Sequence, residues 1–328
     1  MCIVWGSSET KSFVHIWIYN HTFSGISDQL EFFIKTFRDF GYGVSVSKFP
    51  KKNSLNFVIE NFSTIRDRQI LVDFCLTNKK RVSVIMTEHV DFIKNSVYFH
   101  GKNLTDSSDY MAQTTKIQRV LGLIECSKFI NSLVSLGDLP TLNNLSTFLP
   151  SIPIYRLPFP SIKFFLNESG LRNDFLFIGA LTTYRKELIK GICGFGFNVC
   201  FPNFKRNFFI SRKLRNHYVS SSKVVLNIPQ VKDWFWLSTM RVIVSLANGK
   251  PTLSINSQDF SEIHNCVYQT KSVFLFDKRN LLFLLKNWFF LYKKAYLWYM
   301  NSAALFRRRT SFFEKFLIKW FRDELINL

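Results

Sequence analysis

The sequence predicts an α/β protein of two Rossmann-like, doubly wound domains that face each other across a cleft. Short apolar strands alternate with amphipathic helical stretches along most of the chain, which is typical of parallel sheets covered by helices. The 328 residues exceed what one compact core usually holds, so two domains are expected. Prolines clustered within 150–160 separate two runs of this alternation.

The first run makes residues 1–150 the predicted N-terminal domain. A strand over 13–20 leads through a turn into a helix over 26–41, whose apolar residues recur at helical spacing and which ends on Gly41. The elements predicted after it are strands over 42–49, 55–62 and 81–89 and helices over 67–80 and 113–125. The strand over 81–89 is nearly continuous in apolar and β-branched residues, as buried parallel strands are.

The second run makes residues 171–277 the predicted C-terminal domain, after a linker over 151–170 and before C-terminal amphipathic helices over 278–328. Its predicted elements are strands over 174–178, 197–201, 223–229, 251–256 and 272–276 and helices over 184–194, 237–248 and 258–264. Ligands of open parallel sheets bind beyond the carboxyl ends of the strands, and clefts between domains are preferred pockets. We therefore expect the site between the two domains.

Charge and composition limit the classes of partner and of chemistry that the protein can have, but they do not select one. Lys and Arg number 43 against 23 Asp and Glu, a formal charge of +20, which favours nucleic acid, an anionic membrane surface or a nucleotide-linked substrate. The six cysteines form no CxxC pair or Cys/His cluster, so neither zinc nor a disulfide framework is expected. No Walker motif occurs, and no GxGxxG in the first domain, which argues against an NTPase or a dehydrogenase.

Four segments carry a resemblance to a known family: "FIGALTTYRKELI", "SSKVVLNIP", "RVIVSLANGKPTLS" and "QDFSEIHNCVYQTKSVFLF". In order and spacing they resemble the carboxyl-terminal domain of GT-B fold glycosyltransferases, in particular the bacterial spore-maturation-like group of glycosyl transferases (group 1 type). The likeness covers roughly 170–277 well and the first domain only in architecture. It implies a hexosyltransferase-like enzyme of polysaccharide biosynthesis that uses a nucleotide-sugar donor and a glycan, lipid-linked or protein acceptor, and needs no cofactor.

The resemblance also implies where the donor binds. Gly179 would let the backbone approach the diphosphate at the start of a helix, and Glu262 would accept the ribose hydroxyls. Because the chain has no DxD triplet for a bridging metal ion, other residues would neutralise the phosphates. Those residues are Arg185, Lys223, Asn227 and Arg241. The alternative is that Gly179 is a plain strand-to-helix turn and Arg185 a solvated surface residue.

Enzymes of this fold resemble one another in placing the catalytic base on the first domain. His21 follows the first strand, and Asp28 could orient its ring. Glu88 and His89 end the strand over 81–89. An imidazole titrates near neutrality, and burial can tune a carboxylate. His21 could equally be a solvent-facing loop residue, and any of the three could hold the acceptor instead.

The C-terminal region mixes aromatic residues with Lys and Arg. Residues 280–300 are expected to cover the first domain, and 305–322 to rest on an anionic membrane or to form a solvated basic face. The N-terminus lacks a secretory pattern, which predicts a cytoplasmic protein, peripheral on the inner face of the membrane. The competing function is a non-catalytic, nucleic-acid-binding protein, which we do not favour because no RNP1 motif occurs.

Overall fold

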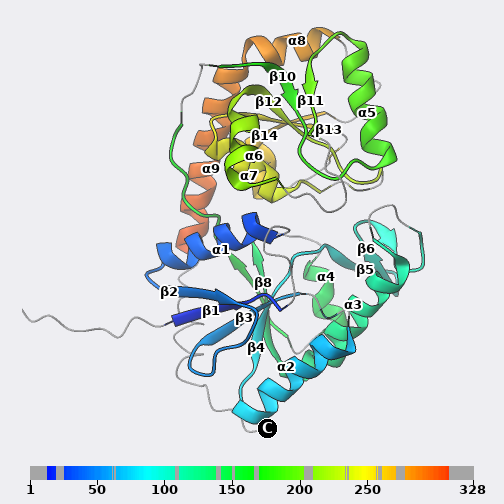
Figure 1. The fold of residues 1–328 in the computed structure, drawn as a ribbon, viewed down its shortest axis with the longest axis vertical. Helices are drawn as coiled ribbons and strands as arrows, with labels where there is room; N and C mark the ends of the chain where they lie inside the picture. The colour runs from blue at the N-terminus through cyan, green and yellow to red at the C-terminus, as the bar shows by residue number, and fades with distance from the viewer. Residues whose placement is uncertain are drawn as a thin grey trace, which may run out of the picture.

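The computed structural model describes residues 13–19, 26–60, 62, 64–107, 111–137, 142–149, 152–165, 170–202, 210–232, 234, 236–255, 257, 261–270 and 278–309. Two parallel sheets with helices around them lie one above the other along the long axis of the molecule (Figure 1). The predicted α/β class with two doubly wound units is therefore confirmed.

The first sheet has six parallel strands in the order β2-β1-β3-β4-β8-β9. They are β1 (Phe13–Trp17), β2 (Gly43–Ser47), β3 (Leu55–Ile59), β4 (Val82–Ile85), β8 (Ile130–Leu136) and β9 (Ile154–Leu157). Its helices are α1 (Ser27–Asp39), α2 (Ile65–Asn78), α3 (Gln113–Glu125) and α4 (Leu142–Phe148). Because β2 and β3 lie on opposite sides of β1, the strand order reverses there, which opens a crevice at the carboxyl ends.

Successive residues of these strands supply the cores on the two faces of the sheet. Phe57 of β3 packs with Phe33 and Phe37 of α1, whereas the next residue, Val58, packs with Leu71 of α2. Such alternation is the period of two that a strand imposes. Burial on both faces explains why the strands read as apolar runs rather than as alternating patterns.

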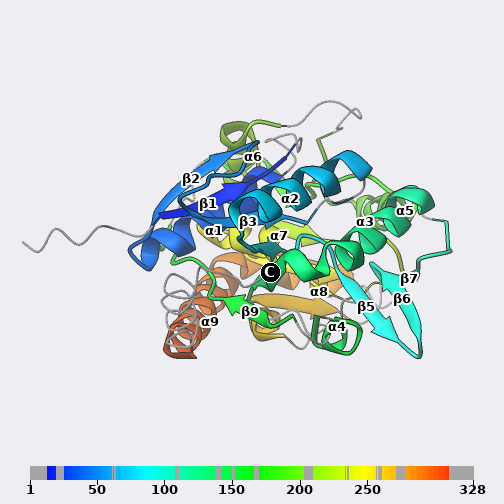
Figure 2. The same ribbon diagram turned by 90° about the horizontal axis from the view of Figure 1, so that it is seen from below.

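Several features of the first domain differ from the prediction, and among them β8 and α4 were not predicted. A small antiparallel sheet of β5 (Val90–Ile93), β6 (Ser96–Phe99) and β7 (Lys102–Asn103) follows β4 and projects on the side opposite α9 (Figure 2). The predicted linker begins too early, because β9 lies inside 151–170 and pairs with β8. Its flanking prolines are tolerated because β9 is an edge strand.

The second sheet has five parallel strands in the order β11-β10-β12-β13-β14. They are β10 (Asn173–Leu176), β11 (Val199–Cys200), β12 (Ser222–Asn227), β13 (Thr252–Ile255) and β14 (Val267–Thr270). With them are α5 (Thr183–Gly194), α6 (Arg212–Ser220), α7 (Thr239–Ala247) and the 3-10 turn η3 (Glu262–Cys266). Helix α6 was not predicted, and the strand predicted over 272–276 lies outside the described residues. The strand order again reverses, here between β10 and β12.

Helices α8 (Lys278–Lys286) and α9 (Trp288–Arg309) follow the second sheet. Helix α9 runs down the side of the second domain to the first (Figure 1). The hydroxyl of Tyr299 on this helix donates to the carbonyl of Pro160 at 2.7 Å. Within the described ranges, no helix combines the length and the apolar character that a bilayer crossing requires. Of the segment 305–322, residues 310–322 lie outside the description.

Candidate active site

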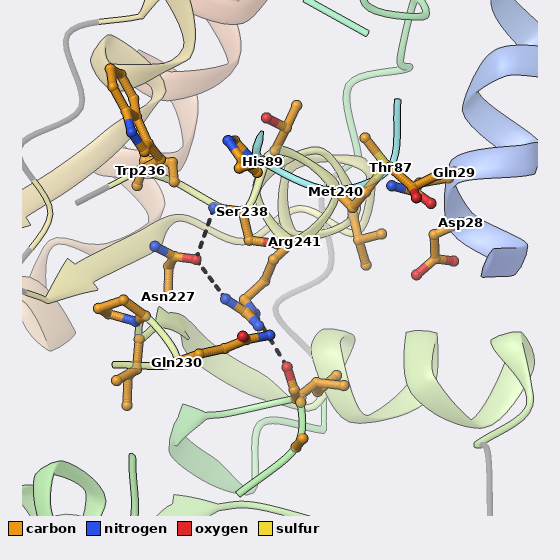
Figure 3. Close-up of a pocket in the computed structure, with 18 of the residues that line it drawn as sticks. Asp28, Gln29, Thr87, His89, Asn227, Gln230, Trp236, Ser238, Met240 and Arg241 are labelled. Carbon is orange, nitrogen blue, oxygen red and sulfur yellow. Dashed lines mark hydrogen bonds between the residues drawn. The ribbon is translucent and has the colours of Figure 1, made fainter. Parts of the chain in front are cut away.

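A cavity of about 660 Å³ opens between the two sheets. One wall comes from the first domain, where the start of α1 and the segment after β4 contribute side chains. The other comes from the turns after β10 and β12 and the start of α7. Figure 3 shows the two groups, with Thr87 and His89 from the first domain and Asn227 and Arg241 from the second. The cavity therefore lies at the carboxyl ends of both sheets, where the predicted cleft was expected.

Gly179 forms the turn between β10 and α5, and two arginines approach it closely. A Cβ placed on Gly179 would lie 3.1 Å from Nη2 of Arg241 and 3.6 Å from Nη1 of Arg185. Any larger residue would push against Arg241, so the absence of a side chain lets both guanidinium groups reach the turn. Both also lie over the ring of Phe177, at 5.2 Å for Arg185 and 5.3 Å for Arg241. The ring face attracts the two cations to the same place.

Arg185 is buried and binds backbone carbonyls, which differs from the solvated surface residue considered above. Its Nε and Nη2 donate to the carbonyl of Ile228 at 3.0 and 2.9 Å, and its Nη1 donates to the carbonyl of Ala180 at 2.8 Å. These bonds join the turn after β10 to the loop after β12. Arg185 therefore shapes the cavity wall, and a direct contact with phosphate stays a prediction.

Arg241 lies at the start of α7 and presents part of its guanidinium to the cavity. Its Nη1 donates to Oδ1 of Asn227 at 2.6 Å and its Nε to the carbonyl of Ile178 at 3.2 Å (Figure 3). Its Nη2 bonds to no described residue, and no described carboxylate forms an ion pair with it. Burial lowers the pKa of Arg241 to about 10, so the group is still a cation at neutral pH. A desolvated cation without a counter-charge favours an anionic ligand.

The N-terminus of α7 adds to this positive potential. No side chain of Ser238 caps the helix, and the N–H of Arg241 already bonds to the carbonyl of Ser238 at 3.0 Å. The N–H groups of Thr239 and Met240 have no partner among the described residues. The residues Ser238, Thr239 and Met240 line the cavity. The positive end of the helix dipole and the Arg241 cation therefore face the same space.

Asn227 lies at the end of β12 and holds Arg241 and the start of α7 in place. It is 1% exposed, and its Oδ1 accepts from Arg241 and, at 3.3 Å, from the backbone N–H of Ser238. Its Nδ2 donates to the hydroxyl of Ser254 at 2.8 Å. These bonds show that Asn227 positions Arg241 and α7, and its direct contact with phosphate stays a prediction.

The structure does not bring Lys223 to the cavity wall, which argues against its predicted role in neutralising phosphate. Lys223 lies near the beginning of β12, whereas Asn227 lies at the carboxyl end of the same strand. The ammonium group of Lys223 pairs with Asp174 at 3.1 Å. Glu262 begins η3 and is not among the described residues that line the cavity. Its contact with a ribose therefore stays a prediction.

Glu88 is an ion-paired residue on the first-domain wall, which argues against its predicted role as the base. Burial alone would raise its pKa, but the partners His100 and Arg119 outweigh burial and lower the pKa to about 2. One carboxylate oxygen pairs with Nε2 of His100, and the other accepts from Nη1 of Arg119 at 3.0 Å. Arg119 in turn pairs with the buried Glu60. A carboxylate with so low a pKa is a weak proton acceptor.

His100 was missed in the sequence. It lies between β6 and β7 with a φ of +52°, and its backbone N–H donates to the carbonyl of His89 at 3.0 Å. Its ring lines the cavity and pairs with Glu88. A carboxylate bonded to one ring nitrogen fixes the imidazole tautomer and orientation. The only sequence signal was a histidine before Gly101 in a turn, which points to no site by itself.

His89 lines the cavity as a neutral imidazole. Burial, and then the proximity of His100, lowers its pKa to about 3. Its Nδ1 has no hydrogen-bond partner among the described residues, and its ring packs edge-on against Trp234 at 4.6 Å. His89 therefore lies on the cavity wall as a weaker base than an ordinary histidine. His21 lies outside the described residues, so its role stays a prediction.

Contacts between the domains flank the cavity. Arg215 of α6 pairs with Asp28 of α1, and Arg212 pairs with Glu31 at 3.0 Å. Asp28, expected to orient His21, is thus held by the other domain. Trp234, from the loop after β12, packs between the domains against His89 and His100. Among the described residues, no three His, Cys, Asp or Glu side chains gather as a metal site would require.

Comparison with known proteins finds similarity at the level of solved structures. No protein-family profile and no curated protein sequence matches the chain. An α1,3-fucosyltransferase is 10% identical with a TM-score of 0.41, over 90% of this chain and 83% of that one. The pneumococcal O-GlcNAc transferase GtfA, in complex with UDP and GlcNAc, is 11% identical with a TM-score of 0.49, over 87% and 60%. TarM is 12% identical with a TM-score of 0.43, over 81% and 54%.

Proposed function

We propose that the chain is a GT-B glycosyltransferase, which moves a sugar from a nucleotide-sugar donor to a glycan, lipid-linked or protein acceptor without a metal ion. The observation that carries the proposal is the Nη2 of Arg241, which bonds to none of the described residues, at the Gly179 turn and beside the start of α7. A diphosphate has the charge and the acceptor oxygens that this wall lacks. A cavity of about 660 Å³ has room for a ligand of nucleotide-sugar size.

The second-domain wall would stabilise the leaving group. As the bond between the anomeric carbon and the phosphate oxygen breaks, negative charge grows on the nucleoside diphosphate. Arg241 and the N–H groups of α7 are already oriented toward that position by Asn227, so they need little rearrangement. This arrangement supplies positive charge from the chain itself, which supports the proposal that no metal ion is needed.

The first-domain wall would receive the acceptor. We assign the neutral form of His100, whose Nε2 bonds to Glu88, as the group that takes the proton from the attacking hydroxyl on its other ring nitrogen. Glu88 orients the ring and stabilises the imidazolium that forms. The bond from the acceptor oxygen to the anomeric carbon forms as the bond to the diphosphate breaks. His89, neutral and also on the wall, would hydrogen-bond the acceptor.

Ligand screening tests this function before the acceptor is known. Titration calorimetry should show that the protein binds one nucleoside diphosphate, with binding unchanged in EDTA. UDP and GDP come first because GtfA was solved with UDP and an α1,3-fucosyltransferase with GDP. Single-stranded RNA should not displace the nucleotide. If the protein bound RNA tightly but bound none of UDP, GDP and CMP, the nucleic-acid-binding alternative would be favoured. If EDTA abolished nucleotide binding, metal independence would be overturned.

A further inference from the structure

Helix α9 has two faces of different character. Its inner face packs against the protein, where Tyr292 and Tyr299 are wholly buried. The hydroxyl of Tyr292 accepts from the backbone N–H of Phe165 at 2.9 Å, and that of Tyr296 donates to the carbonyl of Ile162 at 3.2 Å. These tyrosines recur at helical spacing and bind the segment between the domains, so the rotation of α9 about its own axis is fixed.

The outer face of α9 is apolar and basic. Phe290, Leu297 and Trp298 are 65%, 53% and 45% exposed, which is unusual for side chains of this size. Lys293 and Lys294 lie among them, are exposed, and form no hydrogen bond or ion pair with the described residues. At 100° per residue these five positions fall on one side of the helix. We call these five residues the outer face.

The charged side chains of α8 and α9 have a single sign. No Asp or Glu occurs anywhere in residues 278–309. A second copy of the chain seated on the outer face would bring lysines against lysines, which opposes a symmetric dimer. The apolar side chains stand on one convex helix, and a bilayer interface needs no matching pocket to receive them. Lysine stems can extend beside buried aromatic rings and keep their ammonium groups at the lipid headgroups.

We propose that the outer face of α9 is a docking surface for an anionic lipid bilayer, on which the protein rests peripherally. This inference is independent of the proposed glycosyl transfer, because it concerns a surface away from the cavity. Apolar side chains would enter the headgroup boundary, and the two lysines would meet anionic lipids. The proposal places the membrane contact on residues 290–298 of α9, whereas the sequence suggested 305–322.

Vesicle sedimentation tests the proposal on the full-length protein. Wild type should pellet with vesicles of phosphatidylglycerol and phosphatidylcholine at 0.1 M salt, less at 1 M, and little with phosphatidylcholine alone, because salt shortens the Debye length from about 10 to about 3 Å. Lys293→Glu/Lys294→Glu should weaken binding at least about tenfold. Phe290→Ser/Leu297→Ser/Trp298→Ser should weaken it by a similar factor, since exposed positions can be changed without opening the core.

Matched controls separate the outer face from general effects. Lys186→Glu/Lys190→Glu reverses two exposed charges on α5, and Phe49→Ser removes a ring that is 74% exposed on the first domain. Both should bind vesicles like wild type, and all variants should melt at the wild-type temperature. Equal pelleting of wild type and the α9 variants, or no pelleting of wild type, would overturn the proposal. Loss of a dimer in the α9 variants by ultracentrifugation would instead identify a second copy as the occupant.

Discussion

Replacing Arg241 with alanine is expected to weaken binding of the nucleoside diphosphate at least tenfold. The guanidinium faces the cavity without a carboxylate partner among the described residues, so its charge is available to the ligand. A hydrogen bond to a charged group contributes roughly 1.5 to 3 kcal/mol, which corresponds to about a tenfold or greater change in Kd. Titration calorimetry of wild type and variant measures the change.

Lys223 offers the matched control for Arg241. It is a cation of the same domain, but it lies near the amino-terminal end of β12, away from the cavity, and pairs with Asp174. Lys223→Ala should leave the Kd for the nucleotide within about twofold, because a partly exposed ion pair contributes little to the rest of the protein. Equal weakening by the two substitutions would show that binding responds to net charge. An unchanged Kd in Arg241→Ala would show that Arg241 does not contact the phosphates.

Replacing His100 with alanine is expected to lower the rate of sugar transfer by about 10²- to 10⁴-fold, the usual contribution of a general base. The Kd for the donor should change little, since His100 lies on the acceptor wall. Glu88→Gln removes the carboxylate that orients His100 and should slow transfer as well. If the two residues act as a unit, the double variant should be no slower than His100→Ala alone.

The exposed His217 of α6 provides the control for this series. His217→Ala should retain full turnover, because that ring lies outside the cavity lining. Single-turnover kinetics with the donor bound separates the chemical step from binding. Full activity in His100→Ala with loss in His89→Ala would move the base to His89. Full activity in both would place it elsewhere, with His21 the next residue to change.

The sequence best predicted those residues of the second-domain wall whose position follows from the order of strand, turn and helix along the chain. A glycine directly after an apolar strand, and arginines in the first turns of the helices that follow strands, must lie at the carboxyl edge of a parallel sheet. Gly179, Arg185 and Arg241 are accordingly together in the cavity wall. The same reasoning could have excluded Lys223, which stands near the start of its strand, whereas Asn227 stands at the end.

The first-domain wall depended on contacts that sequence order does not reveal. His100 and Glu88 meet only because the small sheet of β5 to β7 folds back, so that the backbone of His100 bonds to that of His89. Burial and these ion pairs then turn Glu88 from a candidate base into an orienting group. The roles of buried polar residues such as Arg185 likewise depend on carbonyls more than forty positions away.

Photolabelling maps the donor site most directly. The protein would be irradiated with an azido-substituted form of the nucleoside diphosphate that binds, with and without excess unmodified nucleotide, and the labelled peptides identified by mass spectrometry. We expect protectable label in the segments that line the cavity, around 178–180, 227–230 and 236–241. Label confined to other surfaces, such as α8 and α9, or label that excess nucleotide does not suppress, would contradict a nucleotide site between the two sheets.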